Sequence, residues 1–220
     1  MCFSATASFI AAGATFVIGA ATLSRVDSAR VLPMASVAMI FAVQQAIEGT
    51  LWLDLPIAPT GAVSSSLSFL YLFFAYVFWP VYVPIAVLLL EPTKRLRRPL
   101  LGCLAVGLGL SAHLLWWILT RPIGASAQGH HIVYETGYQA SIPVAAAYMI
   151  ATGLPLALSS HRWVLSLGLV ILVGSIVAYI FYWQAFVSVW CFFAAAASAV
   201  IFGHFQWAHR QRFRLAGSRY

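Results

Sequence analysis

Three polar side chains stand close together in a segment that is otherwise as apolar as lipid. Residues 41–53 read FAVQQAIEGTLWL and contain Gln44, Gln45 and Glu48. At helical spacing Gln44 lies one turn before Glu48 and Trp52 one turn after it, so these side chains share one face. An ionisable side chain inside such a segment is costly unless it faces a partner or a water-filled cavity. We therefore interpret Glu48 as the centre of a site, with Gln44, Gln45 and Trp52 as neighbours that bind a cofactor.

The chain around this segment has the composition of a helical membrane protein. Its 220 residues are 62% hydrophobic and 8% charged, with a mean hydropathy of +0.91. A soluble domain has about a quarter charged residues. The apolar runs are long and do not alternate, unlike the roughly 10-residue alternating segments of a membrane barrel. We predict an all-α, polytopic integral membrane protein with a single domain over residues 1–220.

Seven apolar segments are long enough to cross a bilayer, which predicts a seven-transmembrane-helix bundle. They cover approximately residues 5–24, 33–53, 64–90, 100–120, 138–158, 163–181 and 184–206. The last two segments come from one continuous run, 163–207, which contains no Asp, Glu, Lys or Arg and has His204 as its one histidine. At 1.5 Å per residue this run is about 68 Å long, twice the hydrocarbon thickness, so it must fold back. We expect the turn at residues 182–183.

The basic residues indicate which way the spans face. All but one of the 12 Lys and Arg residues fall on one side of the predicted membrane, and Arg121 alone lies on the other side. Cytoplasmic segments carry such an excess of positive charge. We therefore predict that the N-terminus lies outside and the C-terminus in the cytoplasm. The net charge of +7 lies in short segments that flank apolar spans. We therefore predict that the protein's partner is the lipid bilayer and that it does not bind nucleic acid.

With this orientation, further reactive side chains fall in the outer half of the membrane. Glu48 precedes Asp54 by six residues, which places it about 9 Å beneath the outer surface. The same count places His113 roughly 12 Å and Cys191 roughly 10 Å beneath the outer surface. The other members of this outer set are Cys2, at the outer end of the first span, and His130, His131 and Glu135, in the external loop 121–137.

Carboxylate, imidazole and thiolate groups are ligand types for zinc, copper and iron. The outer set therefore predicts a transition-metal site, zinc or copper, in which Glu48 and His113 are the catalytic residues and core ligands. The other expected metal ligands are Cys2, Cys191, His130 and His131. With zinc, a metal-activated water that attacks a lipid-like amide or ester is the natural chemistry of a membrane metalloenzyme. With copper, electron transfer is the expected function.

Two alternatives use the same residues in other ways. In a small proton-coupled transporter or receptor, Glu48 takes up a proton or binds a cationic ligand, although the chain lacks the internal repeat of many transporters. In a non-catalytic accessory subunit, Glu48 only hydrogen-bonds to its neighbours and fixes the helix packing. A homo-oligomer or a larger membrane complex is compatible with each of these functions.

Three stretches of the sequence carry a resemblance. They are the opening MCFSATASF, the QQAIEGTLWL that contains Glu48, and VWCFFAA at residues 189–195. Together they resemble an uncharacterised family of bacterial multi-pass membrane proteins. The resemblance implies a location in the cell inner membrane, with the periplasm as the outer side. It implies no activity, and it draws attention to the same residues, Cys2, Glu48 and Cys191.

Overall fold

The computed structural model describes residues 4–138, 141–181 and 197–207, and these residues are mostly helical. In chain order the elements are α1 (Ala5–Leu23), α2 (Leu32–Asp54), α3 (Ala62–Leu72), the π-helical segment η1 (Phe73–Phe78), α4 (Trp79–Leu90), α5 (Lys94–Thr120), strands β1 (Gly124–Gln128) and β2 (His131–Glu135), α6 (Ile142–Thr152), α7 (Leu154–Leu158) and α8 (Arg162–Phe181). Residues 197–207 form a further helical segment.

Four helices in the described ranges are long and apolar enough to cross a membrane. They are Ala5–Leu23, Leu32–Asp54, Ala62–Leu90 and Lys94–Thr120, and they coincide with the first four predicted spans. The described parts of the other predicted spans are also helical, but their crossing of the membrane, and so the count of seven, stays a prediction. The expected turn at residues 182–183 lies outside the described residues.

Helix α5 begins at Lys94, six residues before the predicted span 100–120. The basic residues between Lys94 and Pro99 form its first turns. Lys and Arg are good helix formers, and Pro99 removes only one backbone hydrogen bond near the start of the helix. The helix therefore extends beyond the apolar segment into the basic end of the molecule.

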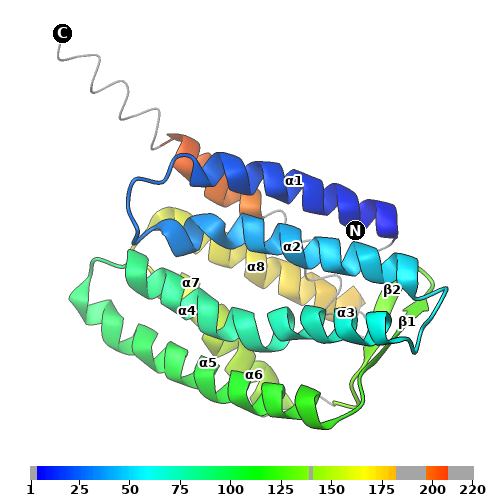
Figure 1. Cartoon of the computed structure of the whole chain (residues 1–220). Coiled ribbons are helices and arrows are strands. Elements are labelled where there is room, and N and C mark those ends of the chain that lie inside the picture. The colour runs from blue at the N-terminus through cyan, green and yellow to red at the C-terminus, as the bar shows by residue number, and fades with distance from the viewer. Residues whose placement is uncertain (1–3, 139–140, 182–196, 208–220) are drawn as a thin grey trace.

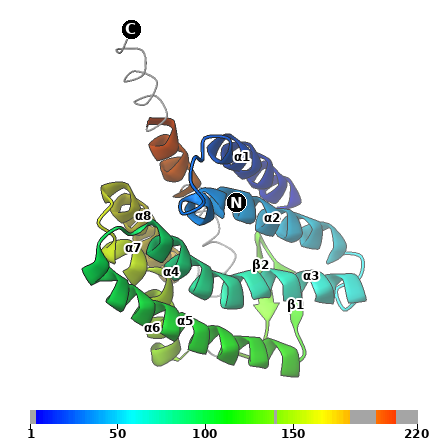
Figure 2. The same ribbon diagram turned by 60° about the vertical axis from the view of Figure 1, so that its left-hand side comes forward.

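The helices pack side by side in a bundle (Figures 1 and 2). Helix α1 lies against α2, α2 contacts α3 and α4, and α4 contacts α5. The continuous third span, formed by α3, η1 and α4, therefore lies between α2 and α5. Helices α6 and α7 both contact α4 and α5, and α7 also contacts α8.

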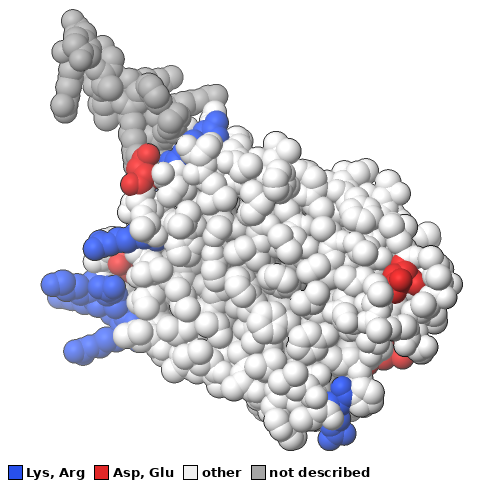
Figure 3. All heavy atoms as spheres, in the orientation of Figure 1, with Lys and Arg blue, Asp and Glu red and all other residues white. Residues whose placement is uncertain are grey.

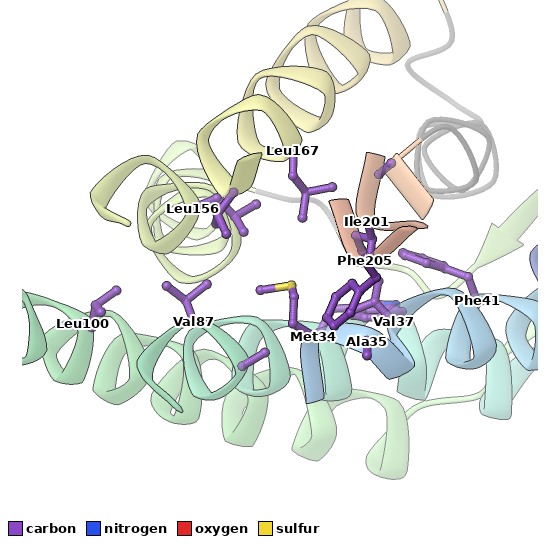
Figure 4. Close-up of a cluster of buried hydrophobic side chains, with 14 residues drawn as sticks. Met34, Ala35, Val37, Phe41, Val87, Leu100, Leu156, Leu167, Ile201 and Phe205 are labelled. Atoms are coloured by element: carbon purple, nitrogen blue, oxygen red, sulfur yellow. The ribbon is translucent and has the colours of Figure 1, made fainter. Parts of the chain in front are cut away.

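The largest apolar core lies toward the basic end of the bundle. In Figure 4, Leu156 of α7 and Leu167 of α8 lie across from Met34 of α2 and Val87 of α4. Ile201, in the segment 197–207, joins them, and it is fully buried. This core holds the ends of α2, α4, α7 and α8 together, whereas the polar residues of α2 lie further along, toward the other end.

Charged side chains gather at the two ends of the molecule. Figure 3 shows most Lys and Arg side chains of this face at one end, and a broad uncharged surface separates them from acidic side chains at the opposite end. An uncharged belt between two charged ends is the surface that a bilayer requires. The distribution supports a membrane protein.

The third span contains two prolines, and its irregular backbone is accommodated by α5. Pro84 has no N–H to donate to the carbonyl of Pro80, four residues before it. A Cβ atom at Gly107 of α5 would collide with this carbonyl oxygen of Pro80. Only glycine lets the two backbones approach so closely, so Gly107 fixes the packing of α5 against the third span.

The π-helical segment η1 precedes the prolines, and neighbouring helices satisfy its carbonyls. The hydroxyl of Ser111 donates to the carbonyl oxygen of Val77, and the hydroxyl of Tyr148 donates to that of Ala75, each at 2.8 Å. Such bonds replace those that an irregular helix loses inside a membrane. Because π-helical segments occur frequently at functional sites, the residues that follow η1 in the chain are candidates for a functional site.

A β-hairpin lies within the segment 121–137. The sequence analysis predicted an external loop here, in an all-α fold, so the two strands were not predicted. Strands β1 and β2 pair antiparallel, and Gly129 and His130 form the turn between them. Ile132 packs on Leu51 of α2, while the ring of Tyr134 stacks on Tyr71 of α3 with centroids 4.8 Å apart. The hairpin therefore packs against α2 and α3.

At the basic end, a buried carboxylate links two connections of the bundle. Glu91 follows α4 and accepts hydrogen bonds from the backbone N–H of Thr93 at 3.0 Å and from Ser160, whose N–H and hydroxyl lie at 2.9 and 2.7 Å. Burial raises the pKa of this carboxyl, but the hydrogen bonds from Ser160 and Thr93 outweigh burial and lower the pKa from 4.5 to about 2. Glu91 therefore joins the start of α5 to the start of α8 as a carboxylate.

Candidate functional site

The polar face of α2 is buried inside the bundle. Gln44 and Gln45 are each 1% exposed, and Glu48 is 0% exposed. The apolar residues Val43 and Leu53 of the same helix are exposed instead, as a lipid-facing surface requires. The three polar side chains therefore face protein, which is the arrangement in which an intramembrane carboxyl is tolerated.

Trp79 of α4 contacts this polar face directly. Its indole Nε1 donates a hydrogen bond of 2.9 Å to Oε1 of Gln44, and its ring stacks on Phe41 with centroids 4.2 Å apart. Trp79 is the first residue after η1, and it is 1% exposed. Trp79 was not predicted as a site residue, because tryptophans of membrane proteins gather at the interfaces. The sequence signal that could have pointed to Trp79 is the next residue, Pro80, because a proline inside a span marks an irregular backbone.

Helix α1 covers another side of α2 in an antiparallel arrangement. Gly19 lies opposite Met39, because a Cβ atom on this glycine would lie 2.7 Å from the backbone nitrogen of Met39. Phe9 lies opposite Gly49, where a Cβ atom would come within 3.0 Å of the phenyl ring. This register brings Ser8, which is fully buried, to the level of the polar segment of α2.

Several buried polar atoms at this level have no hydrogen-bond partner among the described residues. Two are on α2, Nε2 of Gln45 and Nε1 of Trp52, and two are the hydroxyl oxygens of Ser8 on α1 and Ser68 on α3. A buried group left unsatisfied costs about 1–3 kcal/mol, so each is expected to have a partner. These partners come from the rest of the chain, from water or from a ligand. The polar region of α2 therefore extends to the neighbouring helices α1 and α3.

His113 lies away from this region. It is exposed on α5, where its Nε2 atom is 3.3 Å from the hydroxyl of Tyr138. The third span lies between α5 and α2, and Ser111 is the polar residue that α5 buries against that span. The structure therefore does not bring His113 together with Glu48. Equal depth in the membrane predicted the pair, but the rotation of α5 about its axis decides which side chains face inward.

The two histidines of the hairpin also point elsewhere. His130 is exposed in the turn, and His131 begins β2. Successive side chains of a strand point to opposite faces, and Ile132 and Tyr134 occupy the face toward α2 and α3. His131 therefore lies on the face that is turned away from Glu48.

The remaining predicted ligands, Cys2 and Cys191, lie outside the described residues. Within the described ranges, no three or more His, Cys, Asp or Glu side chains form a group that holds a metal ion. A metal site that uses Glu48 with both cysteines thus stays a prediction. The third cysteine, Cys103, is a free, buried side chain of α5.

Comparison with known proteins identifies the family of the chain. Residues 1–217 match the model of a family described as "Family of unknown function (DUF6629)". The chain belongs to this family. The match confirms the expected resemblance to an uncharacterised family, while a bacterial origin stays a prediction. No curated protein and no solved structure matches the chain.

In this DUF6629 member, the buried groups of α2 offer a defined chemistry. A carboxyl group exchanges a proton or pairs with a cation, and each amide supplies both donors and an acceptor. Inside a bundle of low dielectric constant these interactions are stronger than in water. Gln44, Gln45 and Glu48 therefore suit the binding of a proton or of a small cationic or hydrogen-bonding ligand.

Proposed function

We propose that this protein is a small proton-coupled transporter or receptor of the bacterial inner membrane, with its ligand site at Glu48. The proposal includes seven spans, an external N-terminus and a cytoplasmic C-terminus, so that Glu48 lies nearer the periplasm. The observation that carries it is the complete burial of Glu48 within an apolar span. A side chain that only fixes packing does not need to be ionisable, whereas one that exchanges protons does.

The surroundings of Glu48 support this function. Gln44, one turn away, is bonded to the first residue after η1. Irregular backbone inside a membrane is tolerated where it is buried in protein or lines a cavity, and in transporters it accompanies the binding site. A shift of α4 would therefore change the position of Trp79 and with it the amide beside Glu48.

Infrared difference spectra of the purified protein between acid and neutral pH test the proposal. If Glu48 exchanges a proton, the wild type shows the carbonyl band of a protonated carboxyl that disappears as the pH rises. The Glu48→Gln variant lacks this band, while Glu135→Gln, which changes an exposed carboxyl of the hairpin, retains it. A spectrum of Glu48→Gln identical to that of the wild type would exclude proton exchange at Glu48.

Elemental analysis of the same preparations tests the metal-centre alternative. In that alternative Glu48 binds zinc or copper, and Cys2 and Cys191 supply further ligands. The proposal predicts no near-stoichiometric metal in wild-type protein purified without chelator. Metal at that level, lost in Glu48→Gln, would replace the proposed ligand site with a metal centre.

A further inference from the structure

A second site lies at the outer end of α5, apart from Glu48. A cavity of about 540 Å³ opens where α5 continues into β1 and where β2 leaves the hairpin. Its lining includes Trp117 and Arg121 from the end of α5, and Glu135 and Thr136 from the end of β2. A cation, an anion and an indole ring therefore meet at one end of a predicted span.

The cationic side of this cavity is held by aromatic contacts. The guanidinium carbon of Arg121 lies 4.6 Å from the ring centroid of Trp117, in a cation–π arrangement. The indole Nε1 of Trp117 in turn donates to the carbonyl oxygen of Thr136 at 3.0 Å. These contacts fix the Arg121 guanidinium against the wall, with N–H groups that suit a phosphate.

The anionic side is held by the hairpin. Oε1 of Glu135 accepts a hydrogen bond of 2.7 Å from the hydroxyl of Ser126, on the partner strand. Gly124 pairs with Glu135 across the strands, and a Cβ atom there would lie 3.5 Å from Oε2. Arg121 and Glu135 are thus each positioned by a neighbour of their own, and both line the same cavity.

The cavity lies where lipid headgroups are expected. It begins at the end of the span Lys94–Thr120, and beside it α5 exposes Trp116 and Leu119, which are 57% and 64% exposed. An exposed Trp at the end of a span sits at headgroup level, and exposed Leu faces the acyl chains. A molecule in the cavity therefore has access to lipid along α5.

We propose that this cavity binds the zwitterionic headgroup of an outer-leaflet phospholipid, with its phosphate on Arg121 and its ammonium group on Glu135. A purely anionic headgroup would bring its charge close to the Glu135 carboxylate, which disfavours it. Soluble phosphoethanolamine offers the same two charges without acyl chains. The exposed apolar surface beside the cavity favours the lipid.

Native mass spectrometry of the detergent-solubilised full chain tests the proposal with three probes: phosphatidylethanolamine, phosphatidylglycerol and phosphoethanolamine. The wild type is expected to bind phosphatidylethanolamine more tightly than phosphatidylglycerol. Arg121→Gln weakens phosphatidylethanolamine binding by about fivefold, as does Glu135→Gln, because each removes one exposed charge pair. Glu135→Gln also strengthens phosphatidylglycerol binding, since the repulsion is removed.

The controls separate this site from other sources of binding. Arg97→Gln, at an exposed position at the basic end, leaves the preference unchanged, and so does Glu48→Gln. Unchanged lipid binding in both Arg121→Gln and Glu135→Gln would overturn the proposal. Displacement of phosphatidylethanolamine by phosphoethanolamine at equal concentration would overturn the lipid assignment and identify a soluble zwitterion as the occupant.

Discussion

The indole of Trp79 donates a 2.9 Å hydrogen bond to the side-chain oxygen of Gln44 and thereby joins the irregular third span to the polar face of α2. Both side chains are almost completely buried. Gln44 lies one turn from Glu48, so the bond connects the backbone after η1 with the surroundings of the buried carboxyl. The position of α4 and the state of Glu48 are therefore expected to influence each other.

Replacing Trp79 with phenylalanine should destabilise the protein. The substitution keeps a stacking partner for Phe41 but removes the donor to Gln44, and a buried acceptor that loses its donor costs about 1–3 kcal/mol. Thermal unfolding in detergent measures the effect. Trp116→Phe is the matched control, because Trp116 is 57% exposed and should change stability little. Equal stability of the two variants would show that the bond contributes nothing.

Two glycines of α5 should respond in opposite directions to the same substitution. Gly107→Ala places a methyl group against the carbonyl oxygen of Pro80 and forces α5 away from the third span, so we expect a loss of stability of about 1–3 kcal/mol. Gly109→Ala meets no atom within 4 Å, and alanine favours the helix by up to about 1 kcal/mol. Thermal unfolding of both variants in one detergent compares them. Stabilisation by Gly107→Ala would contradict the close packing.

Acid should weaken the contact between the start of α5 and the start of α8. The pKa of Glu91 is about 2 in the folded protein, below its ordinary value of 4.5. Its contribution to stability is therefore fully present above about pH 4.5 and is lost as the pH falls toward 2. The free energy of unfolding of the wild type, measured between pH 2 and 6, should show this loss of stability. If the stability of Glu91→Gln had the same pH dependence as that of the wild type, Glu91 would be excluded as the source of the loss.

Shortening Ile132 should loosen the hairpin without unfolding the bundle. Ile132 is 1% exposed and packs on Leu51 of α2 and on Leu55, which directly follows that helix. Ile132→Ala therefore removes much of the apolar contact under the hairpin. We expect faster proteolytic cleavage between β1 and α6 than in the wild type. His130→Ala, at the exposed turn, serves as the control and should be cleaved at the wild-type rate. Equal rates for both variants would contradict the contact.

The helices could be predicted from the sequence because their lengths are set by the bilayer. The long apolar segments that contain Glu48 and Pro84 had no alternative to a helix in which every backbone group is satisfied. The burial of Glu48 was also predictable, since a carboxyl cannot face lipid at low cost. Depth and hydropathy were therefore sufficient to predict these two features.

The side-chain partners could not be predicted in the same way. His113 has the depth expected of a neighbour of Glu48, but the rotation of α5 is set by the contact of Gly107 with Pro80, which no periodicity of α5 reveals. The hairpin was missed because β1 reads GASAQ, which lacks the β-branched and aromatic residues of a typical strand. Pairing with β2 and packing on α2 compensate for this weak propensity.

Proton uptake by the purified protein tests the central claim most directly. A pH-sensitive dye counts the protons bound per chain when the solution is acidified from neutral pH, for the wild type, Glu48→Gln and Glu135→Gln. If Glu48 is a proton-exchanging site, Glu48→Gln takes up about one proton per chain fewer than the wild type. The difference falls within the pH range in which the infrared band of the carboxyl changes. The variant folds as well as the wild type. Equal uptake by the wild type and a folded Glu48→Gln would contradict the claim and leave Glu48 as a residue of helix packing.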